Sequence, residues 1–237
     1  RTTPVVEQLR KETKNQNIEF IPLDLSDLSS IRQFAETFKA KYNRLDILIN
    51  NAGVMMILDR RVTKDGFEMQ FGTNHIGHHY LTTLLLDLLK SSAPSRVINV
   101  SSNGHELFGK MYWDDLMAEK DYGPAKAYGQ SKLANVLFSQ ELQRRMDLEN
   151  ANVKVVSLHP GAVRTELARH VTENKLYWVL QWATYPFWLY FAKSSVEGAQ
   201  TSLYCALEDQ QRLKGGAYYT DCKEKQPGVE ARKEGDG

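Results

Sequence analysis

The chain has 237 residues, of which 42% are hydrophobic and 25% are charged, and its formal net charge is +1. This length and composition fit one ordinary globular α/β domain rather than two domains. The small net charge gives no basis for a nucleic-acid partner or for charge-driven binding to an anionic membrane. The only cysteines, Cys205 and Cys222, cannot form a disulfide framework, so a reducing intracellular compartment is the default expectation.

Metal binding is not predicted. The sequence contains no internal repeat and no Cys/His pattern with zinc-type spacing. His78 and His79 are adjacent on a predicted helix, so their side chains point to different faces. We interpret them as structural or surface residues rather than as metal ligands.

Predicted helices and strands alternate along the chain. In chain order we expect a helix over residues 4–13, a strand over 18–23, a helix over 28–42 capped by Asp27 or Ser26, a strand over 46–49, a helix that contains Asn74 and runs to Lys90, a strand over 97–100, a helix that carries Tyr128 and ends near Arg145, a strand over 153–158, a helix over 196–207 and a strand over 217–220. Such alternation predicts βαβ units and a parallel sheet with helices on both faces.

The segment AYGQSK, residues 127–132, places Tyr128 and Lys132 four residues apart. Side chains at positions i and i+4 of a helix share one face, so the phenol and the ammonium can point at one site. A tyrosine with a pKa near ~10 is a poor proton donor or base at neutral pH. A fixed cation nearby lowers that pKa and makes the phenol usable in proton transfer. Taken alone, such a pair is also common on helix surfaces.

Two further motifs stand where predicted strands end. Asn50-Asn51-Ala52-Gly53 follows the apolar run 45–49, as in a buried parallel strand that enters a loop. Ligands of open α/β sheets bind at the carboxyl ends of the strands, and Ala and Gly let a flat ligand approach the backbone. The strand before Ser101 and Ser102 also ends in polar residues. An ordinary turn or a helix cap would explain either motif in isolation.

The fourth position is Asn74, within a predicted helix, where an Asn is usually solvated or satisfied by a local hydrogen bond. With the three motifs above, and in this order along the chain, it resembles the short-chain dehydrogenase/reductase family. The phrases NNAGVMM, TNHIGHHYLT, SKLANVLF and HPGAVRTEL are most similar to its retinol dehydrogenase-like branch. The resemblance covers nearly the whole chain and implies an α/β fold with a Rossmann-like, doubly wound parallel sheet. It also implies a catalytic tetrad of Asn74, Ser102, Tyr128 and Lys132.

The resemblance implies hydride transfer between a nicotinamide cofactor, NADP(H) or NAD(H), and an alcohol or carbonyl group. Tyr128 would exchange the proton with the substrate oxygen, which Ser102 would hold. Lys132 would lower the pKa of Tyr128 and bond the nicotinamide ribose, and Asn74 would anchor a water that links Lys132 to solvent. The residues implied for cofactor binding are Asp24 and Leu25 on the adenine side, then Asn51, Ala52, Gly53, Tyr128, Lys132, Pro160, Gly161, Val163 and Thr165, of which Thr165 would bond the carboxamide.

The family's phosphate-binding segment has no counterpart in the sequence. Members begin with a strand, a Gly-rich turn and a helix whose N-terminus holds the pyrophosphate. Arg1 already lies in what resembles the helix after the second strand. We therefore expect that the N-terminal β-α-β unit is missing, that strands 18–23 and 46–49 lose ladder partners, and that this form is inactive. The domain is expected over residues 1–222, with the polar residues 223–237 as a disordered tail.

One aromatic segment begins at Leu176, ends at Ala192 and holds three of the four tryptophans. It is too short for a spanning helix, which needs ~20 apolar residues, and Pro186 interrupts it. It is either a helix packed on the core or an aromatic lid over a lipophilic substrate, in peripheral contact with a membrane such as the endoplasmic reticulum. A retinoid fits such a lid, as do a steroid and a xenobiotic carbonyl.

A second hypothesis is a non-catalytic interaction protein, or pseudoenzyme, that keeps part of the fold. The complete tetrad favours an enzyme, whereas the absence of the phosphate loop favours the alternative. A cytoplasmic location and a homo-oligomer are compatible with both hypotheses. Binding of a nicotinamide nucleotide would distinguish them.

Overall fold

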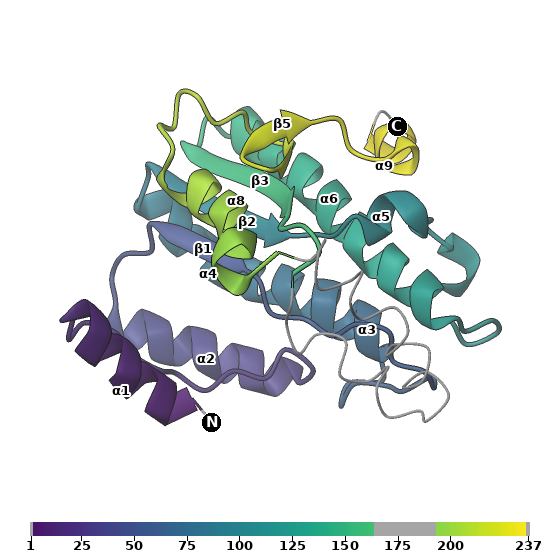
Figure 1. The fold of residues 1–237 in the computed structure, drawn as a ribbon, viewed down its shortest axis with the longest axis horizontal. Helices are drawn as coiled ribbons and strands as arrows, with labels where there is room; N and C mark the ends of the chain where they lie inside the picture. Colours follow the sequence, from purple (N-terminus) through teal and green to yellow (C-terminus); the bar gives the residue numbers. More distant parts are fainter. Residues whose placement is uncertain (1, 164–192, 236–237) are drawn as a thin grey trace.

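The computed structural model describes residues 2–163 and 193–235. In this part of the chain a five-stranded sheet has the order β1-β2-β3-β4-β5. Four strands are parallel, β1 (Ile47–Asn50), β2 (Ser95–Val100), β3 (Val153–His159) and β4 (Tyr218–Thr220), and β5 (Lys223–Lys225) is antiparallel to β4. The sheet confirms the predicted Rossmann-like architecture (Figure 1).

Helices cover both faces of the sheet (Figure 1). The face covered by α8 (Ser195–Leu207) buries the strand residues Ile98, Val100, Val156 and Leu158. The other face is covered by α4 (Gly77–Ser91) and α6 (Pro124–Leu148), and it buries Val97, Val153 and Val155. Successive side chains of a strand point to opposite faces. Strands that are covered on both faces therefore need continuous apolar runs, which is why β2 and β3 could be predicted from the sequence.

The first 45 residues are arranged differently. α1 (Thr2–Thr13) and α2 (Leu28–Lys41) have the predicted positions, and α2 packs along α4 through Ile31 and Ala35. The predicted strand over residues 18–23 is wrong, because this segment forms no strand. A strand needs a neighbour to complete its hydrogen-bond ladder. Within the described residues β1 pairs only with β2, and no strand lies beside residues 18–23.

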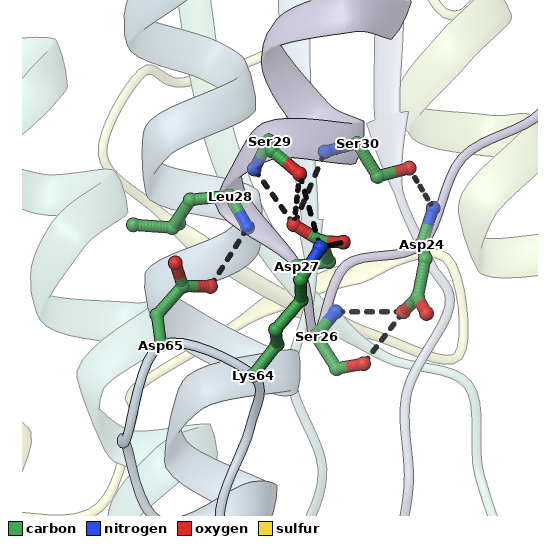
Figure 2. Close-up of polar contacts among 8 residues, drawn as sticks. All are labelled: Asp24, Ser26, Asp27, Leu28, Ser29, Ser30, Lys64 and Asp65. Carbon is green, nitrogen blue, oxygen red and sulfur yellow. Dashed lines mark hydrogen bonds and ion pairs between the residues drawn. The ribbon is translucent and has the colours of Figure 1, made fainter.

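Side-chain carboxylates organise the start of α2, as Figure 2 shows. Asp27 is the N-cap and accepts hydrogen bonds from the backbone N–H groups of Ser29 at 2.8 Å and Ser30 at 3.3 Å. Asp65, from a distant loop, accepts from the N–H of Leu28 at 2.9 Å. These bonds satisfy helix N–H groups that have no partner within the helix. Of the two predicted caps, the structure selects Asp27.

The predicted helix around Asn74 is interrupted. A short α3 (Met69–Phe71) leads into a π-helical turn, η1 (Gly72–Ile76), and only then into α4. Asn74 lies in the π-helical turn. Such turns are rare and occur frequently at functional sites.

The C-terminal residues correct a second prediction. Instead of a disordered tail, the structure has β5, paired with β4, and α9 (Val229–Gly235), which packs on α6. Ala231 of α9 is fully buried among core residues of α6. The average polarity of the segment predicted disorder, but a strand partner and one buried alanine are sufficient to place it. Two short helices, α5 (Gly104–Leu107) and η2 (Trp113–Asp115), were not predicted from the sequence.

Candidate active site

A cavity of about 1090 Å³ opens where β1, β2 and β3 end. The carboxyl ends of parallel strands are the usual binding edge of this architecture. The loops after the three strands contribute most of the wall, and α6 contributes Tyr128 and Lys132. Predicted site residues that line the cavity are Asn51, Ala52, Gly53, Ser102, Tyr128, Lys132, Pro160, Gly161 and Val163. The structure thus brings together residues that are more than a hundred positions apart in the sequence.

Tyr128 and Lys132 lie one helical turn apart on the buried face of α6, with 6% and 4% of their surface exposed. The ammonium of Lys132 is 5.9 Å from the centre of the Tyr128 ring. Gly104 also lies directly against the ring, because a Cβ atom at this position would lie 2.9 Å from Tyr128 Cε1. The helix and the loop after β2 therefore set the position of the phenol together.

The pKa of Tyr128 is raised, chiefly by burial, and a side-chain hydrogen bond with Ser102 opposes this effect. This direction is the reverse of the predicted one. Lys132 is directed elsewhere, since its Nζ donates to the carbonyl oxygen of Val100 at 3.0 Å. The phenol is thus held in its protonated form at neutral pH. In that form it can donate a proton to an oxygen atom in the cavity.

Burial lowers the pKa of Lys132 to about 8. An ammonium group has three N–H donors. One donor of Lys132 bonds to the carbonyl oxygen of Val100, which is its hydrogen-bond partner among the described residues. The remaining donors lie near the loop after β1, because a Cβ atom at Gly53 would be 3.7 Å from Lys132 Nζ. Lys132 therefore keeps donor capacity for an oxygen-rich ligand in the cavity.

Asn74 is completely buried behind the cavity wall. Its Nδ2 donates to the carbonyl oxygen of Val54 at 2.9 Å and to Ser131 Oγ at 3.0 Å, and its Oδ1 accepts from the N–H of Val54 at 2.8 Å. Its backbone carbonyl already accepts from Asn135 and His78. In the structure Asn74 fastens the loop after β1 to α6. The predicted role in holding a water molecule stays a prediction.

Two of the predicted cofactor residues do not line the cavity, and a third lies outside the described residues. Asp24 is exposed, and its carboxylate accepts hydrogen bonds from the N–H and the hydroxyl of Ser26 (Figure 2). Leu25 is buried with α2 and α4. Thr165 and the aromatic segment over residues 176–192 lie outside the described part of the chain.

Several residues that line the cavity were not predicted from the sequence. Met55, Met56, Leu107 and Phe108 give the wall an apolar part. The two methionines directly follow the NNAG motif and could have been included, whereas Leu107 and Phe108 belong to the end of the unpredicted α5. His159, where β3 ends, accepts a hydrogen bond at Nδ1 from the N–H of Asn103 at 3.2 Å. Burial lowers its pKa to about 4, so it is neutral at physiological pH.

Comparison with known proteins identifies the family. A family model described as short chain dehydrogenase matches residues 1–176. Human retinol dehydrogenase 11 is 45% identical over 97% of this chain and 69% of its own length. The chain belongs to the short-chain dehydrogenase family. The NNAG, Asn74, Ser102 and Tyr128-to-Lys132 motifs resembled this family, and its retinol dehydrogenase-like branch is confirmed.

Further relatives agree. Human retinol dehydrogenase 12 is 49% identical over 91% of this chain and 65% of its own length. The chain therefore spans about two thirds of the length of these curated relatives. A crystal structure of an uncharacterised protein from Mycobacterium paratuberculosis is 34% identical, with a TM-score of 0.72, over 97% of this chain and 75% of that one. NADPH-bound carbonyl reductase from chicken fatty liver, at 22% identity and a TM-score of 0.60 over 90% of this chain and 78% of that one, shares the fold.

Proteins of this family use NAD(P), and Lys132 offers the cavity hydrogen-bond donors of the kind that such a nucleotide needs. The free donors of Lys132 suit the hydroxyls of a ribose. The absence of a side chain at Gly53 lets Asn74 pack directly against the loop after β1, since a Cβ atom there would lie 2.8 Å from Asn74 Oδ1. Among the described residues no group of three or more His, Cys, Asp or Glu side chains is arranged to hold a metal ion. Likewise, no helix in that part of the chain is long and apolar enough to cross a bilayer.

Proposed function

We propose that this protein is an oxidoreductase that interconverts a lipophilic alcohol and the corresponding carbonyl compound with NADP(H), and that retinoids are its substrate class. One observation carries the proposal. Tyr128, Ser102 and Lys132 reach one cavity at the carboxyl ends of the strands, with Asn74 fastened directly behind it. This grouping of a phenol, a hydroxyl and an ammonium around one cavity supports proton transfer to a substrate oxygen.

In the direction of reduction, the hydroxyl of Ser102 would hold the substrate oxygen beside Tyr128. The buried phenol, whose pKa is raised, would donate its proton to that oxygen. Lys132 would help to hold the nicotinamide cofactor in the cavity, where its chemistry when bound would be to supply the hydride. The nearby ammonium of Lys132 would stabilise the phenolate that remains after proton transfer. Oxidation of an alcohol reverses these steps, with the phenolate as the base.

The walls of the cavity support a lipophilic substrate. Four apolar side chains, Met55, Met56, Leu107 and Phe108, line it beside the polar centre. Burial of apolar surface contributes about 25 cal/mol per Å² to binding, so a long hydrocarbon chain would gain most from such a wall. Relatives at 45–49% identity are named retinol dehydrogenases. Because such substrates partition into lipid, the proposal includes peripheral association with a membrane.

The test is the reduction of a retinaldehyde by the purified chain. NADPH and NADH are compared at equal concentration, and the loss of reduced nicotinamide is followed together with the formation of retinol. The proposal predicts turnover that is faster with NADPH, whereas the sequence taken alone predicted an inactive form, so this assay decides between the two expectations. Nicotinamide fluorescence measures binding in the same samples. Binding without turnover would favour a non-catalytic protein of this fold, and the absence of binding with both nucleotides would contradict the proposal.

A further inference from the structure

His105 of α5 is buried, with 1% of its surface exposed, and both nitrogens of its ring are engaged. Nδ1 is 2.6 Å from the backbone carbonyl oxygen of Ser102. Nε2 is 3.0 Å from the backbone N of Gly228, in the turn between β5 and α9. The ring therefore lies between the backbone of a proposed catalytic residue and a segment more than a hundred residues later in the chain.

The two partners determine where the imidazole proton lies. A carbonyl oxygen can only accept, so Nδ1 must carry the hydrogen that Ser102 receives. The N–H of Gly228 can only donate, so Nε2 must offer its lone pair. A single neutral tautomer satisfies both bonds. The opposite tautomer or a charged ring would place two N–H groups against each other at Gly228 or two lone pairs against each other at Ser102.

We propose that His105 is a positioning residue, which fixes the backbone of Ser102 by tying it to the C-terminal segment that contains β5 and α9. The proposal rests on the proposed function, because that function gives Ser102 its role. It identifies His105 as the link through which the ordered C-terminal segment supports the site.

The surroundings of the ring are rigid enough for this role. The ring of Tyr218 packs edge-on against it, with 4.8 Å between the ring centres. An ion pair between Lys225 and Glu106, at 2.9 Å, joins the C-terminal segment to α5. The backbone at Gly228 also lies close to the backbone of α5, because a Cβ atom at Gly228 would lie 3.2 Å from Cα of Glu106. These contacts hold the imidazole and both of its hydrogen-bond partners in place.

The contact is sensitive to acid. Burial lowers the pKa of His105, and the hydrogen bond to Ser102 and the charge of Glu106 oppose this effect, whereas Lys225 lowers the pKa further. His159, the last residue of β3, has a lowered pKa as well and adds no positive charge near His105 at neutral pH. Protonation of His105 would replace the acceptor at Nε2 by a donor and release Gly228. The protection factor of the Gly228 amide, which is the exchange rate corrected for the intrinsic pH dependence of exchange, should therefore fall at pH values below the ordinary histidine pKa of 6.5.

The first test uses the wild-type chain and needs no enzymatic activity. Nitrogen NMR of protein with labelled histidine reports which ring nitrogen carries the proton. We expect His105 in the Nδ1–H form at neutral pH, with a slowly exchanging Gly228 amide. An Nε2–H tautomer or a charged ring at neutral pH would overturn the proposal.

The second test separates the two bonds. In His105→Asn the amide nitrogen can take the place of Nδ1, which keeps the bond to Ser102 and loses the one to Gly228. In His105→Gln the amide oxygen can take the place of Nε2, which keeps Gly228 and loses Ser102. We expect His105→Gln to lower kcat by on the order of 10- to 100-fold, the effect of a displaced reactive group. His105→Asn should retain most of kcat but lose the protection of Gly228 from exchange.

The control is Lys233→Met, which removes an exposed ion pair with Glu230 within α9 and neither histidine bond. It should leave kcat and the tautomer of His105 unchanged. Equal losses of kcat in the Asn and Gln variants would overturn the positioning role. If the wild-type chain shows no turnover, the proposed function fails, while the tautomer and exchange measurements still decide the structural link. They also decide it if the Gln variant does not fold.

Discussion

The cavity lies beside two regions of the molecule that are stabilised in different ways. On the side of β2, β3 and β4, each strand has a ladder partner, and Val97, Ile98 and Val155 are completely buried. On the side of residues 14–27 the backbone forms no strand and no β-ladder hydrogen bonds, and Phe20 is 50% exposed. The helix that follows this segment begins with N–H groups that the carboxylates of Asp27 and Asp65 satisfy (Figure 2). The side chains that we propose as catalytic all come from the first region or pack on it.

Gly77, at the start of α4, joins the two regions. A Cβ atom at this position would lie 2.4 Å from the carbonyl oxygen of Leu25. The lack of a side chain allows the segment before α2 to lie directly on the helix that follows Asn74. Changes on the sheet side should therefore alter chemistry or core stability, whereas changes on the α2 side should alter stability alone.

The largest effect is expected for Tyr128→Phe. Phe keeps the ring against Gly104 and removes the proton donor, so kcat should fall by about 10²-fold or more, with a nearly unchanged melting temperature and cofactor affinity. Steady-state kinetics and nicotinamide fluorescence measure the two quantities. A variant with near wild-type kcat would show that another group transfers the proton.

Lys132→Met should remove activity and yet stabilise the fold. The pKa of Lys132 is lowered from 10.5 to about 8. Since the unfolded chain binds this proton more tightly, the folded state carries the full cost of the buried charge below pH 8 and loses that cost as the pH approaches 10.5. We expect a gain of about 3 kcal/mol at neutral pH, measured by urea unfolding.

The pH dependence provides the control for this variant. Wild-type stability should rise relative to the variant as the pH increases through the interval between the two pKa values. A gain that is the same at neutral pH and at about pH 10 would mean that packing, rather than the charge of Lys132, causes it.

A smaller effect is expected for Gly77→Ala, which separates the two regions. The added methyl group cannot be accommodated beside the Leu25 carbonyl without a shift of the backbone, so the free energy of unfolding should fall by about 1–3 kcal/mol. Thr83→Ala, on the exposed side of the same helix, serves as the control. Equal stability of Gly77→Ala and wild type would show that the segment before α2 is not held against α4.

The smallest effect is expected for Asp27→Ala, which removes the N-cap of α2. The melting temperature should decrease slightly, and kcat should not change, because no cavity residue depends on this cap. Lys64 and Ser29 hold the pKa of Asp27 well below its ordinary value of 3.8. The contribution of Asp27 is therefore present above that value and is lost at lower pH. Asp27→Asn, which can still cap the helix, should behave like wild type at neutral pH.

Local patterns in the sequence were sufficient for much of the fold. The apolar runs of β2 and β3 and the helical spacing of α2 predicted those elements, since burial on both faces or on one stripe leaves a periodic trace. The pairing of Tyr128 with Lys132 needed only the geometry of one helical turn. The strand-end motifs likewise placed Gly53 and Ser102 at one edge of a parallel sheet.

Contacts between distant segments decided the rest. Residues 18–23 have the composition of a strand but lack a neighbour, and the polar C-terminal segment is ordered because β4 and α6 supply one. The π-helical turn at Asn74 depends on bonds to Val54 and Ser131 across the site. The raised pKa of Tyr128 follows from its burial, and the link through His105 joins residues far apart in the chain. Hydrogen-bond partners and desolvation are properties of the assembled structure, so periodicity and spacing along one chain carry no record of them.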